Sequence, residues 1–289
     1  MLTTSDIIKK VRELEIKSKK LTRHLFTGEY HSAFKGRGMS FKEVREYHHG
    51  DDIRFIDWNV SARFNHPFSK VFEEERELTV MLLVDLSGSS FFGTRSSTKK
   101  DLLTEIGAVL TFSAVSNNDK VGVLFFSDKV EMFIPPKKGR DHALYIVREL
   151  LTVEPKGKGT NISEALRRFT NSTRQRCISF LLSDFMDNGF EEALKVAGKK
   201  HDLIGVRVYD PLSVEVPDVG LIQVEDAETG AMALVDTSDF LVRKSYREEF
   251  FAFSAYCKNI FTKAGCDLLH IRTDEDYVKV LQKFFISRN

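Results

Sequence analysis

The sequence predicts an α/β fold, doubly wound, in which helices cover both faces of a mostly parallel sheet. Five short apolar runs each stop at an aspartate, as TVMLLV does before Asp85. Unbroken apolar runs of this length are typical of strands buried on both faces of a sheet. Stretches with helical periodicity separate the runs, and strands that alternate with helices form parallel sheets. The 289 residues suffice for one such domain with an N-terminal extension.

The elements follow one another regularly along the chain. The expected strands are residues 79–84, 121–128, 177–184, 203–210 and 266–274, and the expected helices between them include residues 100–115, 143–151, 162–169 and 190–199. Two further strand-like runs, residues 221–226 and 231–236, flank Ala227-Glu228-Thr229-Gly230, which predicts a C-terminal hairpin insertion. We expect the aromatic residues of the next helix to be mostly core, with a partner-facing position as the alternative for some phenylalanines; they are Phe240, Phe250, Phe251, Phe253 and Tyr256.

Side chains with oxygen atoms gather where two of the expected strands end. Asp85 and Asp184 each follow an apolar run. In parallel sheets, ligands bind outside the carboxyl ends of the strands, where the strand order reverses. Ser87 and Ser89 follow Asp85 at steps of two, and Gly88 between them allows a tight turn. These residues therefore point several oxygens at one place.

Thr160, in a loop before an expected helix, completes a candidate site for one divalent cation. Hydroxyl and carboxylate oxygens are hard ligands that suit Mg²⁺ or Mn²⁺ better than zinc. We expect the hydroxyls of Ser87, Ser89 and Thr160 to be the main direct ligands. Asp85 and Asp184 are expected to act partly through water, which leaves much of the cation's charge uncompensated. Such an ion attracts a carboxylate from outside, so the site is predicted to dock a partner and not to catalyse a reaction.

These five residues resemble the metal-ion-dependent adhesion site of von Willebrand factor type A domains. The resemblance rests on Asp85-x-Ser87-x-Ser89, on Thr160 before a helix and on Asp184 after an apolar strand, and it covers residues 78–289. It implies a doubly wound domain in which a glutamate or aspartate of a partner protein completes the metal shell. One position departs from the pattern, because Phe185 follows Asp184 where many adhesion domains have glycine.

A second resemblance lies upstream, to the bacterial domain-of-unknown-function family fifty-eight. It rests on Gly36-Arg37-Gly38, residues 41–47, Gly50-Asp51-Asp52-Ile53-Arg54, Ile56-Asp57-Trp58, Ala62-Arg63 and residues 72–76. Members of that family usually accompany a MoxR-type AAA+ ATPase in a chaperone-like pair. The resemblance therefore implies a MoxR-type partner and a protein client that carries acidic residues.

The chain divides by these patterns into residues 1–77, an N-terminal helix with the family signature, and residues 78–289, the α/β domain. In the signature, Asp52 is expected to cap a short helix on which Arg54 and Asp57 can pair. Two interpretations stay open for its charges. They form either a shell that fastens the segment to the sheet or a partner-binding face built around Arg45, Arg54 and Arg63.

The first twenty-five residues predict a basic amphipathic helix that packs on the sheet or leads into it, and attachment to a membrane surface is the alternative. Its apolar stripe consists of Ile7, Val11, Leu14, Leu21 and Leu25. No apolar stretch approaches the length that spans a membrane, and the N-terminus lacks the apolar core of a signal peptide.

Composition sets further bounds on the function. With 43 basic and 42 acidic residues, the net charge of +1 gives no reason to expect nucleic acid as a partner. Three cysteines lack metal-binding spacing and cannot all pair, which suggests a reducing, cytoplasmic environment.

Enzymatic functions find weaker support in the sequence. Lys156-Gly157-Lys158-Gly159-Thr160 lacks the full phosphate-binding pattern, and His48-His49 is best interpreted as an exposed pair in a loop. A magnesium-dependent phosphohydrolase with Asp85 as the nucleophile remains the competing class, and a structural scaffold braced by its cation is the third. We expect a protein-binding module that is not an enzyme.

Overall fold

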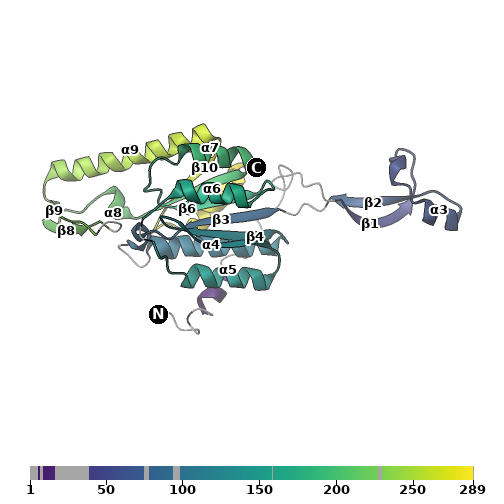
Figure 1. Cartoon of the computed structure of the whole chain (residues 1–289), viewed down its shortest axis with the longest axis horizontal. Helices are drawn as coiled ribbons and strands as arrows, with labels where there is room; N and C mark the ends of the chain where they lie inside the picture. The colour runs from purple at the N-terminus through teal and green to yellow at the C-terminus, as the bar shows by residue number, and fades with distance from the viewer. Residues whose placement is uncertain are drawn as a thin grey trace. The chain divides into compact units, whose positions relative to one another are not determined.

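The computed structural model describes residues 6, 9–16, 39–74, 78–93, 98–157, 159–226 and 230–288. The chain forms two compact units, one of residues 28–78 and one of residues 1–27 and 79–289 (Figure 1). We call them the β1–β2 unit and the α/β unit. The helical residues 9–16 thus belong to the same unit as the sheet.

The α/β unit is built on a six-stranded sheet in the order β10-β7-β6-β3-β4-β5. Its strands are β3 (Thr79–Asp85), β4 (Lys120–Phe126), β5 (Val130–Lys137), β6 (Ile178–Ser183), β7 (Asp202–Tyr209) and β10 (Asp267–Arg272). All neighbours are parallel except β5, which runs antiparallel to β4 at the edge. From β3 the chain first adds β4 and β5 on one side and then β6 on the other, so the order reverses at β3 and β6.

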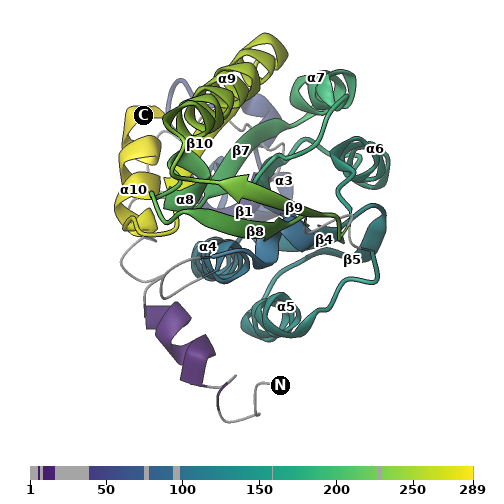
Figure 2. The same cartoon turned by 90° about the vertical axis from the view of Figure 1, so that its left-hand side faces the viewer.

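Helices cover both faces of this sheet, as the end-on view shows (Figure 2). One face carries α4 (Lys99–Ser116), α5 (Arg140–Thr152) and α10 (Tyr277–Arg288), and the other carries α6 (Ile162–Ser172), α7 (Glu191–Lys200) and α9 (Phe240–Ala264). Local sequence explains where several of them begin. Thr98 and Asp101 form a capping box at α4, and the Asn161 side chain accepts a hydrogen bond from the Glu164 amide at α6.

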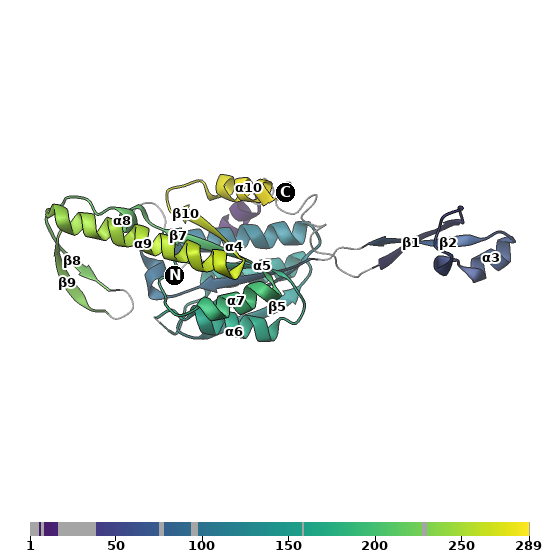
Figure 3. The same cartoon turned by 90° about the horizontal axis from the view of Figure 1, so that it is seen from above.

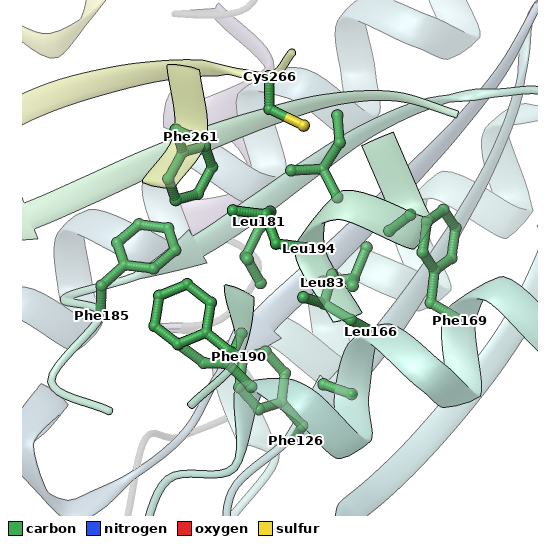
Figure 4. Close-up of a cluster of buried hydrophobic side chains, with 14 of the residues drawn as sticks. Leu83, Phe126, Leu166, Phe169, Leu181, Phe185, Phe190, Leu194, Phe261 and Cys266 are labelled. Atoms are coloured by element: carbon green, nitrogen blue, oxygen red, sulfur yellow. The ribbon is translucent and has the colours of Figure 1, made fainter. Parts of the chain in front are cut away.

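Alternate side chains of β3 point into the two hydrophobic layers, one on each face of the sheet. Met81 and Leu83 belong to a cluster of fully buried side chains under α6, α7 and α9 (Figure 4). Within it, the Phe185 ring meets Phe261 edge-on at 5.2 Å between centroids and lies 6.1 Å from Phe190. Because successive side chains of a strand point to opposite faces, one apolar run supplies both layers.

The predicted fold class is confirmed, and each of the five expected strands appears within a few residues of its expected range. Strand β5 was not among the expected strands, and its sequence contains Pro135-Pro136. Proline cannot donate to a neighbouring strand and is confined to edges. Strand β5 lies at the edge of the sheet, where the two prolines are tolerated.

The predicted hairpin is present as β8 (Leu221–Glu225) and β9 (Met232–Asp236), but the aromatic residues of α9 are not mostly core. Phe240 and Phe251 are 66% and 51% exposed, and the buried residues of α9 are Cys257, Ile260 and Phe261 near its C-terminal end. Figure 3 shows the first turns of α9 beyond the end of the sheet, beside the β8–β9 hairpin, and from Phe250 onward the helix packs on β7 and β10.

The β1–β2 unit is an antiparallel pair, β1 (Met39–Glu46) and β2 (Phe68–Glu74), joined through η1 (Ile53–Phe55) and α3 (Trp58–Phe64). The single helix expected after Asp52 is thus divided in two. Asp52 caps η1 and Asp57 caps α3. The expected pairing of Arg54 with Asp57 is wrong, because Arg54 binds Asp52 at 2.6 Å.

The N-terminal helix packs on helices of the α/β unit. Leu14 is 1% exposed, Lys10 forms an ion pair with Asp101 of α4, and Glu15 forms one with Arg140 of α5. Of the predicted stripe, Ile7, Leu21 and Leu25 lie outside the described residues.

Candidate metal site

The predicted site lies at the carboxyl edge of the sheet, where the strand order reverses. Strand β3 ends at Asp85, and β6, paired with it in parallel, ends one residue before Asp184. The Leu86 amide donates to the Phe126 carbonyl, which fastens the loop after β3 to the end of β4. The topology therefore brings the two carboxylates to one place, as expected for doubly wound sheets.

The loop after β3 turns its serine hydroxyls toward each other. The Ser87 amide donates to Asp85 Oδ1 at 2.8 Å, and the short helix η2 (Gly88–Phe91) follows. This turn brings Ser87 Oγ and Ser89 Oγ to 3.1 Å. The predicted spacing of aspartate and serines is thus realised as a cluster of oxygens.

Asp85 is fully buried, and both of its oxygens are engaged. Oδ1 accepts from the Ser87 amide, and Oδ2 accepts from the Ser183 hydroxyl. Burial raises the pKa of Asp85 to about 7, and the nearby charge of Asp184 contributes to that rise, against the hydrogen bonds that lower it. The nearby charge of Asp184 thus disfavours ionisation of Asp85.

Lys99, the first residue of α4, supplies a positive charge at this edge. Its ammonium lies 2.9 Å from Asp184 Oδ2, and both side chains are almost wholly buried. The other oxygen, Asp184 Oδ1, accepts from the Met186 amide at 3.1 Å. Sequence reasoning missed Lys99, since Lys99 and Lys100 are adjacent and only the path of α4 decides which of them turns inward.

Thr160 reaches the same edge through its loop. The next amide, of Asn161, donates to the Ser127 carbonyl just after β4. Glu131 of β5 accepts from the Gly157 amide at 2.9 Å, and Asp187 accepts from the Ile162 amide at 2.8 Å. These contacts hold the loop between the ends of β4 and β6, beside the Asp85 loop.

The donor set fits a hard cation. Within the described ranges, no group of three or more histidine, cysteine, aspartate or glutamate side chains could hold a metal ion. A cation at this edge would therefore depend on the hydroxyls of Ser87, Ser89 and Thr160 together with the two aspartates. Oxygen ligands of this kind suit Mg²⁺ or Mn²⁺. Lys99 already supplies one positive charge at Asp184, so a cation would balance only the charge that remains on the two aspartates.

Phe185, the departure from the adhesion pattern, takes a conformation that glycine adopts at less cost. Its φ is 62°, in the left-handed region, and its side chain is fully buried. The ring packs edge-on against Phe261. Core packing thus holds a strained backbone directly beside Asp184.

The three arginines proposed as a partner face belong to the β1–β2 unit. Arg45 of β1 pairs with Asp51 at 2.8 Å, and Arg54 pairs with Asp52, lowering the pKa of Asp52 to about 2 through its side-chain hydrogen bond. Arg63 is exposed on α3. Two of the three guanidinium groups are therefore already bound to acids of their own unit. His48 and His49 are exposed, as expected.

Comparison with known proteins places the chain among uncharacterised relatives. It is 30% identical over 285 residues to an uncharacterized protein of Mycobacterium bovis, with 96% of this chain and 88% of that protein covered. It also resembles a protein of Mycobacterium avium, 26% identical over 54% of this chain and 93% of that protein.

Solved structures share the fold. The conserved hypothetical protein BatB from Bacteroides thetaiotaomicron aligns with a TM-score of 0.50 at 18% identity, covering 73% of this chain and 98% of that chain. An aerotolerance-related membrane protein from Bacteroides fragilis aligns with a TM-score of 0.52 at 15% identity, covering 73% of this chain and 99% of its own. For this chain, none of the described helices is both long enough and apolar enough to cross a bilayer.

The family assignment rests on residues 43–254, which run from β1 to α9 and so include parts of both units. They match the family described as "Protein of unknown function DUF58", to which this chain therefore belongs.

Proposed function

We propose that this protein is a metal-dependent protein-binding module whose cation binds an acidic side chain of a partner. The observation that carries the proposal is the convergence of Asp85, Ser87, Ser89 and Asp184 at the strand-order reversal, with Thr160 anchored alongside. Neutral hydroxyls leave most of the charge of a bound Mg²⁺ or Mn²⁺ uncompensated. A partner carboxylate would then complete its coordination.

The resemblance noted in the sequence extends this proposal to a partner. We infer that the protein acts with a MoxR-type AAA+ ATPase, in a chaperone-like role toward clients that carry acidic residues. We also infer a cytoplasmic location, which agrees with three buried free cysteines whose thiol pKa values are all raised by burial.

The geometry supports a phosphohydrolase less well than a protein-binding module. A nucleophilic aspartate needs an oxygen that can reach phosphorus, yet Asp85 is 0% exposed and both of its oxygens accept hydrogen bonds. We therefore propose that the protein is not an enzyme.

Calorimetric titration of Mg²⁺ and Mn²⁺ tests the cation site. Replacing Ser87 and Ser89 together by alanine should weaken binding at least about tenfold, since even residues that support metal ligands contribute that much. Ser90→Ala is the matched control. Ser90 lies in the same loop and is fully buried, but its hydroxyl has no hydrogen-bond partner among the described residues. Equal affinities in all three proteins would refute the assignment.

The partner role is tested with a purified MoxR-type ATPase from the same organism. Capture of the ATPase by the intact chain should fall in chelator and in the Ser87→Ala, Ser89→Ala protein, and should persist in Ser90→Ala. A cation that merely braces the loops predicts a different result, in which the double variant loses thermal stability in Mg²⁺ but captures the ATPase normally. That result would contradict the proposal.

A further inference from the structure

A cavity of about 630 Å³ opens beside the candidate metal site, between the carboxyl ends of β6 and β7 and the first half of α9. Ser89, Lys99 and Asp184 line its side nearest the metal site, and Arg207 of β7 lines it as well. Aromatic and apolar side chains form the remaining walls; they are Phe92, Met186, Tyr209, Tyr246, Phe250 and Phe253. The predicted metal site shares Ser89 and Asp184 with this lining and uses none of the aromatic and apolar walls.

Arg207 is the feature that the metal site does not explain. It is 2% exposed, and no carboxylate of the described residues lies within ion-pair distance of it. Its Nε donates to the Asp184 carbonyl at 3.3 Å, and its Nη1 donates to the Ser254 hydroxyl at 2.6 Å. Buried charges are ordinarily paired with an opposite charge, because desolvation is costly. Burial accordingly lowers the pKa of Arg207.

Aromatic rings hold the guanidinium in place without neutralising it. Its Cζ lies 4.8 Å from the ring centre of Phe253, 5.0 Å from that of Phe250 and 5.9 Å from that of Tyr209. Cation–π contacts of this kind position an arginine while leaving donors free for a planar anion. A carboxylate matches the remaining donors of Arg207.

Arg207 has no buried acid of its own among the residues that line the cavity. Asp184 is already bound by the Lys99 ammonium, so it cannot fully serve Arg207 as well. The other two acids that line the cavity, Asp226 and Glu249, are exposed to water. Arg207 is a buried cation, and the acids left to pair with it are exposed to water. An anionic ligand that enters the cavity would supply the missing buried negative charge.

The mouth of the cavity is apolar. Phe92, Met186 and Tyr246 are 47%, 55% and 41% exposed. A small metabolite would leave most of this surface in water, whereas a peptide segment would cover it.

We propose that this cavity receives a carboxylate that adjoins a large apolar side chain in a peptide segment of a protein partner, with Arg207 binding the carboxylate. The inference rests on the proposed function in taking the ligand from a protein. Binding of the carboxylate at Arg207 does not require the cation. A measurement in chelator therefore tests this inference separately from the proposed metal site.

The test is an NMR titration of the full-length, ¹⁵N-labelled chain in chelator. The probe is acetyl-Asp-Phe-amide, and the matched probes are acetyl-Asn-Phe-amide, which lacks the charge, and acetyl-Asp-Gly-amide, which lacks the ring. The Arg207 Nε–H signal and the Tyr209 and Phe250 amides report binding. We expect the Asp-Phe probe to bind at least about tenfold more tightly than the Asn-Phe probe, as hydrogen bonds to charged groups allow. The Asp-Gly probe should also bind more weakly than the Asp-Phe probe.

Two variants assign the effect to Arg207. In Arg207→Gln the Asp-Phe and Asn-Phe probes should bind equally. Glu249→Gln removes an exposed rim charge and should strengthen only the acidic probes, by about twofold, as expected for a screened surface charge. Glu248→Gln, an exposed neighbour outside the cavity lining, should change nothing. If Arg207→Gln does not fold, the comparison of Glu249→Gln with the natural chain still tests whether the acidic probes bind in this cavity.

Several results would overturn the proposal. One is equal binding of the Asp-Phe and Asn-Phe probes to the natural chain, and another is a preference for the acidic probe that survives in folded Arg207→Gln. Binding of inorganic phosphate or of the Asp-Gly probe as tight as that of the Asp-Phe probe would also refute it, because the apolar side chain would then contribute nothing. Loss of Mg²⁺ binding in Ser87→Ala, whose side chain does not line the cavity, with intact probe binding would support both inferences.

Discussion

At the scale of single residues, the buried pair of Lys99 and Asp184 connects stability to the candidate cation. The ammonium and the carboxylate are 2.9 Å apart, and the side chains are 9% and 3% exposed. Breaking a buried pair leaves an uncompensated charge, which costs several kcal/mol. A divalent cation on Asp184 could replace the charge that lysine supplies.

Lys99→Met should therefore lower the free energy of unfolding by about 3 kcal/mol in chelator. With Mg²⁺ present, the loss should be smaller. Urea denaturation in both conditions measures it. Lys195→Met is the control, since Lys195 is exposed and lies 3.9 Å from Glu192, a surface pair of little energetic value. A loss of the same size in Mg²⁺ and in chelator would show that no cation substitutes for Lys99.

His201 gives the protein a dependence on pH far from the candidate site. Its imidazole is 1% exposed, packs on the Phe169 ring at 4.4 Å, and is 3.3 Å from the Cys177 sulfur. Burial lowers the pKa of His201 to about 4. The unfolded chain binds this proton from about pH 6.5 downward, so the folded state loses stability as pH falls from there to about 4.

For His201 the loss on acidification should reach up to about 3 kcal/mol, because each tenfold difference in proton affinity between the folded and unfolded states corresponds to about 1.4 kcal/mol. Urea denaturation between pH 7 and pH 4 should show a shallower dependence for His201→Phe than for the natural chain. The slope should not vanish, because burial also lowers the pKa of His270 to about 4. His49→Gln, at an exposed position, should keep the natural slope. An unchanged slope in His201→Phe would refute the assignment.

At the scale of elements, α9 lies so close to β7 that only glycine fits between them at one position. A Cβ on Gly205 would lie 2.4 Å from the Phe261 ring and 2.8 Å from Leu268 Cδ1. Close packing of α9 on the sheet forms one side of the core drawn in Figure 4 and holds the wall of the Arg207 cavity in place.

Gly205→Ala should therefore reduce the free energy of unfolding by about 1–3 kcal/mol through overpacking. Thermal and urea denaturation measure the change. The second variant, Gly205→Ala with Phe261→Leu, should recover part of the loss relative to the sum of the two single changes, because the smaller side chain makes room. Strict additivity would show that the ring does not oppose the new methyl group.

At the scale of the whole molecule, the chain forms two compact units, and its single tryptophan reports on one of them. Trp58 lies on α3 of the β1–β2 unit and is 70% exposed. The α/β unit contains most of the helices described and the buried cluster around Leu83 and Phe126. Fluorescence and far-UV circular dichroism thus observe different units.

We expect native tryptophan emission close to that of free tryptophan in water, with little further red shift in urea. The cooperative loss of far-UV circular dichroism, which follows the α/β unit, should occur without a matching large change in emission. A partner that binds the β1–β2 unit near Trp58 should shift emission to the blue. A strongly blue-shifted native emission would show that Trp58 is covered in solution.

The sequence alone predicted the α/β class, five of the six strands of the main sheet, the C-terminal hairpin and the candidate residues of the metal site, because each depends on local pattern. Apolar runs that end at Asp85 and Asp184 specify buried strands, and the order of strands and helices specifies a parallel sheet whose carboxyl ends meet. Spacing within one turn was enough to place Ser87 and Ser89 together.

Only the tertiary structure decided which charges are buried and which aromatic residues are covered. Lys99 and Arg207 come from α4 and β7, and no local pattern shows that both reach Asp184. The aromatic residues of α9 look like core in sequence, yet the start of the helix runs past the sheet and leaves Phe240 exposed, and Phe251 is exposed although the adjacent Phe250 packs on Tyr209. Burial depends on what packs against a residue from distant parts of the chain, and that is settled only when the elements assemble.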